Sequence, residues 1–150
     1  MPHDPLLTRL TSAFAKVPGI AAIVLGGSRA RGSAHPSSDY DIGLYFSAAS
    51  PLDTDRLLAA AKEIADDPAA TAVSPVGEWG PWIVGGAWLS VEGRKVDLLY
   101  RSADAVEAVM ESCRAGVVTM DSSPAIRTAS ARRSGWARSP IASHCTIRRP

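Results

Sequence analysis

The sequence predicts an α/β (α+β) fold in which a mixed β-sheet is flanked by helices. Three segments have apolar residues at helical spacing, and four short runs are apolar or alternate with the period of two that strands have. Their order along the chain (helix, strand, strand, helix, strand, strand, helix) is typical of helices packed on one sheet. With 150 residues, of which 46% are apolar, the chain is long enough to enclose a core of its own.

The three helices are expected at residues 5–17, 51–66 and 102–116. Asp4-Pro5 forms a helix start, because aspartate caps free N–H groups and proline suits the first helical turn. Pro18-Gly19 ends the first helix. The third helix has an apolar stripe that we expect to face the core, formed by Val106, Val109, Met110 and Cys113.

The strands are expected at residues 20–25, 40–46, 83–91 and 94–100. The first is a continuous apolar run, which is typical of a buried strand. The last two are joined at Glu92-Gly93, a hairpin turn signal. Residues 67–82 are rich in proline, glycine and alanine, so we expect a long loop there, with a short strand near residues 72–74.

Charge divides the chain into a domain, residues 1–120, and a basic tail, residues 121–150. The tail has six arginines and one acidic residue, and it shows neither helical nor strand periodicity. Three interpretations stay open: a flexible basic arm, a loosely packed cap over the sheet, or a segment translated out of frame from GC-rich DNA. An arginine-rich arm can bind nucleic acid, but we rank that function behind the two given below.

Composition and patterning exclude several classes of protein. The longest apolar run, Ile20 to Leu25, is far shorter than the roughly 20 residues that cross a bilayer. Residues 1–10 do not resemble a secretory signal. Cys113 and Cys145 lack the spacing of a zinc site or a disulfide framework. We therefore expect a cytoplasmic protein with no membrane partner.

The end of the first strand carries a candidate phosphate site. Gly26-Gly27 lets the backbone turn tightly and lets a ligand approach it closely. Ser28 then opens a short helical segment over residues 29–33. The free N–H groups of a helix start, with Arg31 near by, form a cradle for phosphate. The alternative is an ordinary glycine turn in which Ser28 only caps the helix.

Three aspartates form a candidate carboxylate site. Asp39 and Asp41 occupy alternate positions of a strand, so both side chains lie on one face. Neighbouring negative charges are costly unless a cation or a proton lies between them, and paired carboxylates suit Mg²⁺ with substrate phosphates. Asp97 lies in an apolar strand that we expect to pair beside them, where a charge needs a partner. The alternatives are a turn-capping Asp39, a solvated Asp41, and an Asp97 that faces solvent or pairs with Arg94.

Gly27-Ser28, ten intervening residues, Asp39-x-Asp41 and the later Asp97 together resemble the nucleotidyltransferase superfamily typified by polymerase β. The resemblance covers about residues 20–101. It extends to small bacterial members such as aminoglycoside nucleotidyltransferases and the minimal nucleotidyltransferases of toxin–antitoxin pairs. It implies Mg²⁺-dependent transfer of a nucleoside monophosphate from a nucleoside triphosphate, such as ATP, to a hydroxyl acceptor on a small molecule, a protein or an RNA end.

By position, the resemblance implies roles for individual residues. Asp39, Asp41 and Asp97 would be catalytic and hold two Mg²⁺ ions, with Asp97 nearer the acceptor. Gly27 and Ser28 would contact the triphosphate.

Arg31 would be a further neighbour of the phosphates. Larger members of the superfamily add a helical domain that completes the acceptor pocket, whereas here one helix and the tail follow Asp97. We therefore expect either that a homodimer or a protein partner completes the acceptor site or that this site is incomplete. The rival hypothesis is a non-catalytic partner, an antitoxin-like or degenerate domain that retains nucleotide binding.

Aromatic residues gather between the second helix and the last hairpin. Trp79, Trp82 and Trp88 lie within ten residues of one another. Such a group can stack a nucleobase or line an acceptor cleft, and it is also typical of packing over a sheet edge.

Overall fold

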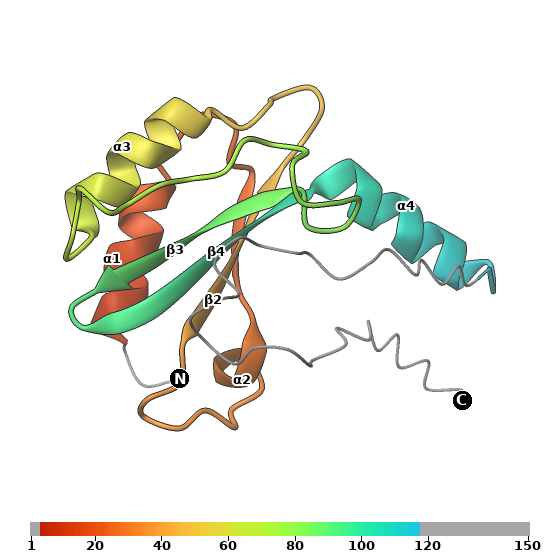
Figure 1. Cartoon of the computed structure of the whole chain (residues 1–150). Helices are drawn as coiled ribbons and strands as arrows, with labels where there is room; N and C mark the ends of the chain where they lie inside the picture. Colours follow the sequence, from red (N-terminus) through yellow and green to blue (C-terminus); the bar gives the residue numbers. More distant parts are fainter. Residues whose placement is uncertain (1–3, 118–150) are drawn as a thin grey trace. The chain divides into compact units, whose positions relative to one another are not determined.

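The computed structural model describes residues 4–117, which form a four-stranded sheet and four helices (Figure 1). The chain divides into two compact units, Met1–Glu107 and Ala108–Pro150, and the whole sheet belongs to the first. The predicted basic tail, residues 121–150, lies outside the described residues, as does Cys145.

The sheet has the strand order β1-β2-β4-β3, from β1 (Ala22–Leu25), β2 (Tyr40–Phe46), β3 (Gly85–Val91) and β4 (Arg94–Ser102). β2 and β4 run parallel at the centre of the sheet. β1 pairs antiparallel with β2, and β3 pairs antiparallel with β4. The predicted mixed sheet is therefore confirmed.

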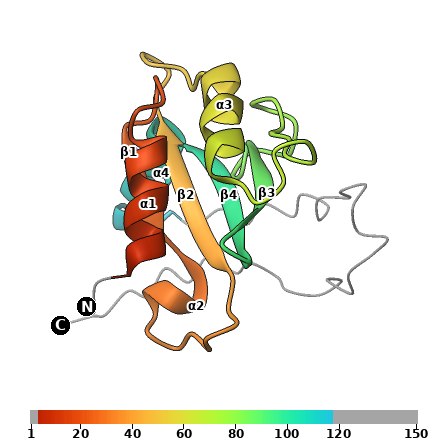
Figure 2. The same cartoon turned by 90° about the vertical axis from the view of Figure 1, so that its left-hand side faces the viewer.

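Helices α1 (Pro5–Phe14) and α3 (Thr54–Ile64) lie side by side on one face of the sheet (Figure 2). Both begin at a capping aspartate: Asp4 accepts a hydrogen bond from the Leu7 N–H, and Asp53 accepts one from the Arg56 N–H. These caps satisfy N–H groups that a helix start otherwise leaves free. The remaining helices are α2 (Gly27–Ala30) and α4 (Ala103–Arg114).

The core lies between the sheet and the pair α1 and α3. Burial alternates along all of β2 and along residues 96–100 of β4, so every second side chain there is buried beneath the helices. Fully buried residues of this layer include Leu10, Leu57, Ile42, Leu98 and Tyr100. Each such leucine or isoleucine contributes about 1.5–3 kcal/mol of burial free energy. The intervening residues, Asp41 and Asp97 among them, are only half-buried on the opposite face.

Two predictions about the strands were wrong. β1 is not a buried strand: it forms an edge of the sheet, and Val24 is 45% exposed. Residues 72–74 form a loop instead of a short strand. The Ser74 N–H does donate to the Gly86 carbonyl at 2.9 Å, but Pro75 follows, and proline has no N–H with which to continue a ladder.

The apolar stripe predicted on the last helix is also not in the core. No residue of α4 is buried, and Met110 is exposed. An amphipathic pattern identifies the apolar side of a helix without identifying what that side contacts. None of the helices within residues 4–117 has the length and apolar character needed to cross a membrane.

Candidate active site

The three predicted aspartates meet on the face of the sheet opposite α1 and α3. Asp41 on β2 is the direct register partner of Asp97 on β4, and neighbouring strands are about 4.8 Å apart. Asp39 directly precedes β2 and lies two residues before Asp41, so it points to the same side. The parallel pairing thus brings the carboxylates of Asp41 and Asp97 close together, although these residues are 56 positions apart along the chain.

In this cluster the effects of burial and negative charge outweigh the opposing charges of Arg31 and Lys95. Burial, together with the charges of Asp41 and Asp39, raises the pKa of Asp97 to about 6. Burial, together with Asp39, also raises the pKa of Asp41, and Arg31 acts in the opposite direction. The protein therefore holds at least two carboxylates in a place where their charged forms are disfavoured.

Among the described residues, no basic side chain forms an ion pair with these aspartates. Within residues 4–117, the ion pair closer than 4 Å is that of Arg9 with Glu92. The predicted alternative, a pair between Asp97 and Arg94, was wrong, because the Arg94 guanidinium donates to the Pro36 carbonyl instead. The aspartates remain available to a ligand.

The glycine turn lies directly against Asp41. The Gly26 N–H donates to the Asp41 carbonyl at 2.7 Å. Gly27 has φ +61°, and a Cβ there would collide with the Asp41 carboxylate. Both the conformation and the contact therefore require glycine.

The helix after this turn differs from the prediction. α2 spans Gly27–Ala30 and not residues 29–33, and Ser28 lies inside it without capping it. The positive φ of Gly27 lets the chain pass from strand to helix at once, so the helix begins two residues early. Arg31 is exposed at the end of α2.

Sequence reasoning missed Arg29. Its Nε donates to the Asp39 carbonyl at 3.2 Å, and its Nη2 donates to the Ser38 carbonyl at 2.7 Å. Its guanidinium also lies 3.7 Å from the centroid of the Tyr40 ring. Arg29 thereby ties α2 to the start of β2 and fixes the backbone of Asp39. The aromatic residue next to Asp39 was the available signal, since arginine often stacks on aromatic rings.

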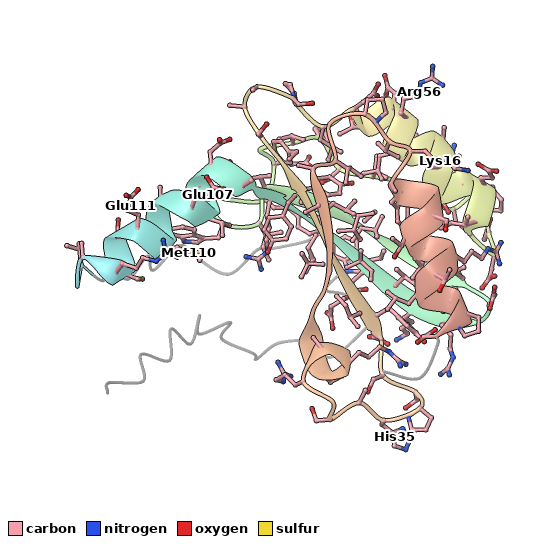
Figure 3. The ribbon with its side chains drawn as sticks, turned by 180° about the vertical axis from the view of Figure 1, so that it is seen from behind. Lys16, His35, Arg56, Glu107, Met110 and Glu111 are labelled. Carbon is pink, nitrogen blue, oxygen red and sulfur yellow. The ribbon has the colours of Figure 1, made fainter. Side chains whose placement is uncertain are left out.

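The loop between α2 and β2 extends away from the sheet. Figure 3 shows His35 at its tip, at the opposite end of the domain from Lys16 and Arg56. The His35 ring contacts the Ser37 hydroxyl at 2.8 Å.

The donor set fits a divalent cation. Within the described part of the chain, no three His, Cys, Asp or Glu side chains already stand as a ready-made metal cluster. Asp39, Asp41 and Asp97 nevertheless provide hard oxygen donors whose mutual repulsion a cation would relieve. Mg²⁺ is commonly held by one or two carboxylates, with water and substrate phosphates as its other ligands.

These features define an α/β protein with three aspartates gathered on the face of its sheet opposite α1 and α3. Residues 7–74 match the family model described as a nucleotidyltransferase domain, which confirms the predicted resemblance to the nucleotidyltransferase superfamily. The match includes Gly27, Ser28, Asp39 and Asp41, whereas Asp97 lies beyond it. No curated protein and no solved structure matches the chain.

Proposed function

We propose that this domain transfers a nucleoside monophosphate from a nucleoside triphosphate to a hydroxyl acceptor, with Asp39, Asp41 and Asp97 as the holders of Mg²⁺. The observation that carries the proposal is the direct pairing of Asp41 with Asp97 beside the Gly26-Gly27 turn. Nucleotidyl transfer is the chemistry of the family whose model matches residues 7–74.

Each part of the site has a task in this reaction. Gly27 and Ser28 contact the triphosphate, and the exposed Arg31 adds positive charge beside them. Divalent cations, when bound, neutralise phosphate oxygens and favour an in-line displacement. As the bond from the acceptor oxygen to the α-phosphorus forms, the bond to the leaving pyrophosphate breaks, and the acceptor hydroxyl releases its proton.

Asp97 is the group that we assign to take up that proton. Its carboxylate lies on β4 directly beside Asp41, and in the metal-free protein burial and the neighbouring aspartates raise the pKa of Asp97 to about 6. Mg²⁺ bound at the same aspartates would counteract that rise, so the assignment rests on the place of Asp97 beside the other two carboxylates. Asp41 holds its ligand through its carboxylate.

The test is a thermal-shift series with ATP, GTP, CTP and UTP, each with and without Mg²⁺. A ligand that binds only the native state stabilises it by about 2.7 kcal/mol at 100 times its dissociation constant. We expect a Mg²⁺-dependent rise in melting temperature for the wild type and none for Asp41→Asn. Glu63→Gln, an equal change of charge at an exposed position of α3, should respond like the wild type.

Two results would contradict the proposal. A shift that survives in Asp41→Asn would place the nucleotide elsewhere. The absence of any shift in the wild type would mean that the fold is kept without its chemistry, and a search for protein partners would follow.

A further inference from the structure

Two tryptophans form a stacked pair on the same face of the sheet as the aspartates. The rings of Trp79 and Trp88 lie with their centroids 4.8 Å apart and their planes at 25°. Trp79 reaches this position because Gly86 has no side chain: a Cβ on Gly86 would come within 2.7 Å of the Trp79 ring. The stack is thus built into the fold by a glycine beneath it.

The pair stands next to the carboxylate cluster. Trp88 is the direct register partner of Asp97, which in turn is the partner of Asp41. The three residues form one row across β3, β4 and β2. With strands about 4.8 Å apart, the Trp88 backbone is one strand spacing from Asp97 and two from Asp41, which is within the length of a nucleotide.

Exposure distinguishes Trp88 from a packing residue. Its side chain is 50% exposed, although its neighbours Ala87 and Leu89, which point to the other face, are buried. Trp79 stacks against the Trp88 ring, and Trp88 nevertheless keeps half of its surface exposed. The interpretation of this tryptophan as mere packing over a sheet edge does not account for an indole that stays half in water beside three aspartates.

We propose that Trp88, supported by Trp79, stacks the base of the nucleoside triphosphate whose phosphates are held at the aspartates. This inference rests on the proposed function. A nucleobase placed on Trp88 would extend the two-ring stack to three. Because every base has a π-face, stacking tolerates all of them, so the site should discriminate weakly among the four nucleotides.

The test compares the affinities of ATP and inorganic tripolyphosphate, both with Mg²⁺, for the wild type and three variants. The wild type should bind ATP more tightly than tripolyphosphate. Trp88→Ala should lower the affinity for ATP about 10-fold and leave the affinity for tripolyphosphate unchanged. Trp88→Phe should retain most of the preference for ATP over tripolyphosphate. Trp82→Ala removes a tryptophan that is 39% exposed and lies in the loop that carries Trp79. This variant should bind both ligands with the wild-type affinities.

A wild-type measurement guards against a variant that fails to fold. ATP should quench tryptophan fluorescence, and tripolyphosphate should not. If ATP and tripolyphosphate bind the wild type equally, or if Trp88→Ala weakens both or neither, base stacking is overturned while the phosphate site stands. If neither ligand binds the wild type, the proposed function itself fails.

Discussion

Asp41 and Asp97 lie directly opposite each other on the two parallel strands at the centre of the sheet. Their carboxylates share the open face, where Asp39 adds a third negative charge and no basic side chain of residues 4–117 pairs with them. A fold that places like charges this close loses stability locally unless a ligand compensates. This conflict gives the first prediction.

Asp97→Asn should stabilise the ligand-free protein at neutral pH. The folded pKa of Asp97, about 6, lies above its ordinary value of 3.8, so the folded state binds the proton more tightly than the unfolded state does. The associated stability is present below pH 4 and is lost as the pH rises through 6. We expect the variant to melt about 2–5 °C higher than the wild type at pH 7.5, with the difference vanishing below pH 4.

Melting temperatures of both proteins across this pH range, without divalent cations, provide the check. Lowered pKa values at Asp4 and Asp66 act in the opposite direction, but they are common to both proteins and cancel in the difference. Asp97→Asn could prove less stable than the wild type, or the difference in melting temperature could stay constant with pH. Either result would show that the ionised Asp97 does not destabilise the folded protein.

Gly27→Ala should cost both stability and ligand binding. The left-handed backbone of Gly27 imposes about 1–2 kcal/mol on any other residue, and the added Cβ would displace the Asp41 carboxylate. Gly32→Ala is the matched control, because Gly32 has φ +70° with open space around it. Urea unfolding should show a loss in both variants, and the Mg²⁺-dependent nucleotide shift should disappear only in Gly27→Ala. Equal nucleotide shifts in the two variants would contradict the role of this contact.

Substitutions of Arg29 should lower the stability of the protein, whereas substitution of Arg31 should lower its affinity for nucleotide. Arg29→Met removes two hydrogen bonds from a charged donor and a contact with the Tyr40 ring, so we expect a loss of about 2 kcal/mol in unfolding free energy. Arg29→Lys should not restore it, since an ammonium cannot reproduce the planar fork.

Arg31→Met should instead leave the unfolding free energy within about 0.5 kcal/mol of the wild type, because Arg31 is exposed. It should weaken nucleotide binding by removing a positive charge from the phosphate side. Denaturant titration and nucleotide titration of the same three variants measure both effects. Were Arg31→Met as unstable as Arg29→Met, Arg31 would also have a structural role, and the proposed division of roles between the two arginines would fail.

The sequence predicted the positions of the strands along the chain better than it predicted how the strands pair. The alternation over residues 40–46 gave β2 with its observed bounds, because a half-buried strand imposes a strict period of two. The pairing of Asp41 with Asp97 depends on the connection through α3 and β3, which no local pattern encodes. The sequence could therefore predict that Asp97 lies on a strand near Asp41, but it could not predict that the two residues are direct register partners.

Short and peripheral elements were less predictable. α2 has four residues, too few for a helical period, so its start was misplaced by two positions. Tyr40 was the only sequence signal for the role of Arg29, since the hydrogen-bond partners of Arg29 are backbone carbonyls ten and nine residues away. The stack of Trp79 on Trp88 was open to three interpretations from the sequence alone, because only the fold places Trp88 beside Asp97.

Two tyrosines on the helix-covered side of the sheet should respond oppositely to loss of their hydroxyl groups. The Tyr40 hydroxyl donates to the Asp4 carboxylate at 2.9 Å. Within the described residues, the Tyr100 hydroxyl is the buried side-chain polar atom without a hydrogen-bond partner, and burial strongly raises the pKa of Tyr100. Tyr40→Phe should therefore lower the unfolding free energy by about 0.5–1.5 kcal/mol, the usual net worth of a hydrogen bond.

Tyr100→Phe should raise the unfolding free energy by about 1 kcal/mol, because it removes a polar group that folding strips of water without compensation. The ring stays in place, so no cavity forms to offset the gain. Both changes lie on the face away from the aspartates, and nucleotide affinity should stay at the wild-type value in each. Urea titration of both variants measures whether each change raises or lowers the unfolding free energy. A loss of stability in Tyr100→Phe as large as that in Tyr40→Phe would mean that the Tyr100 hydroxyl has a partner in solution, such as a buried water.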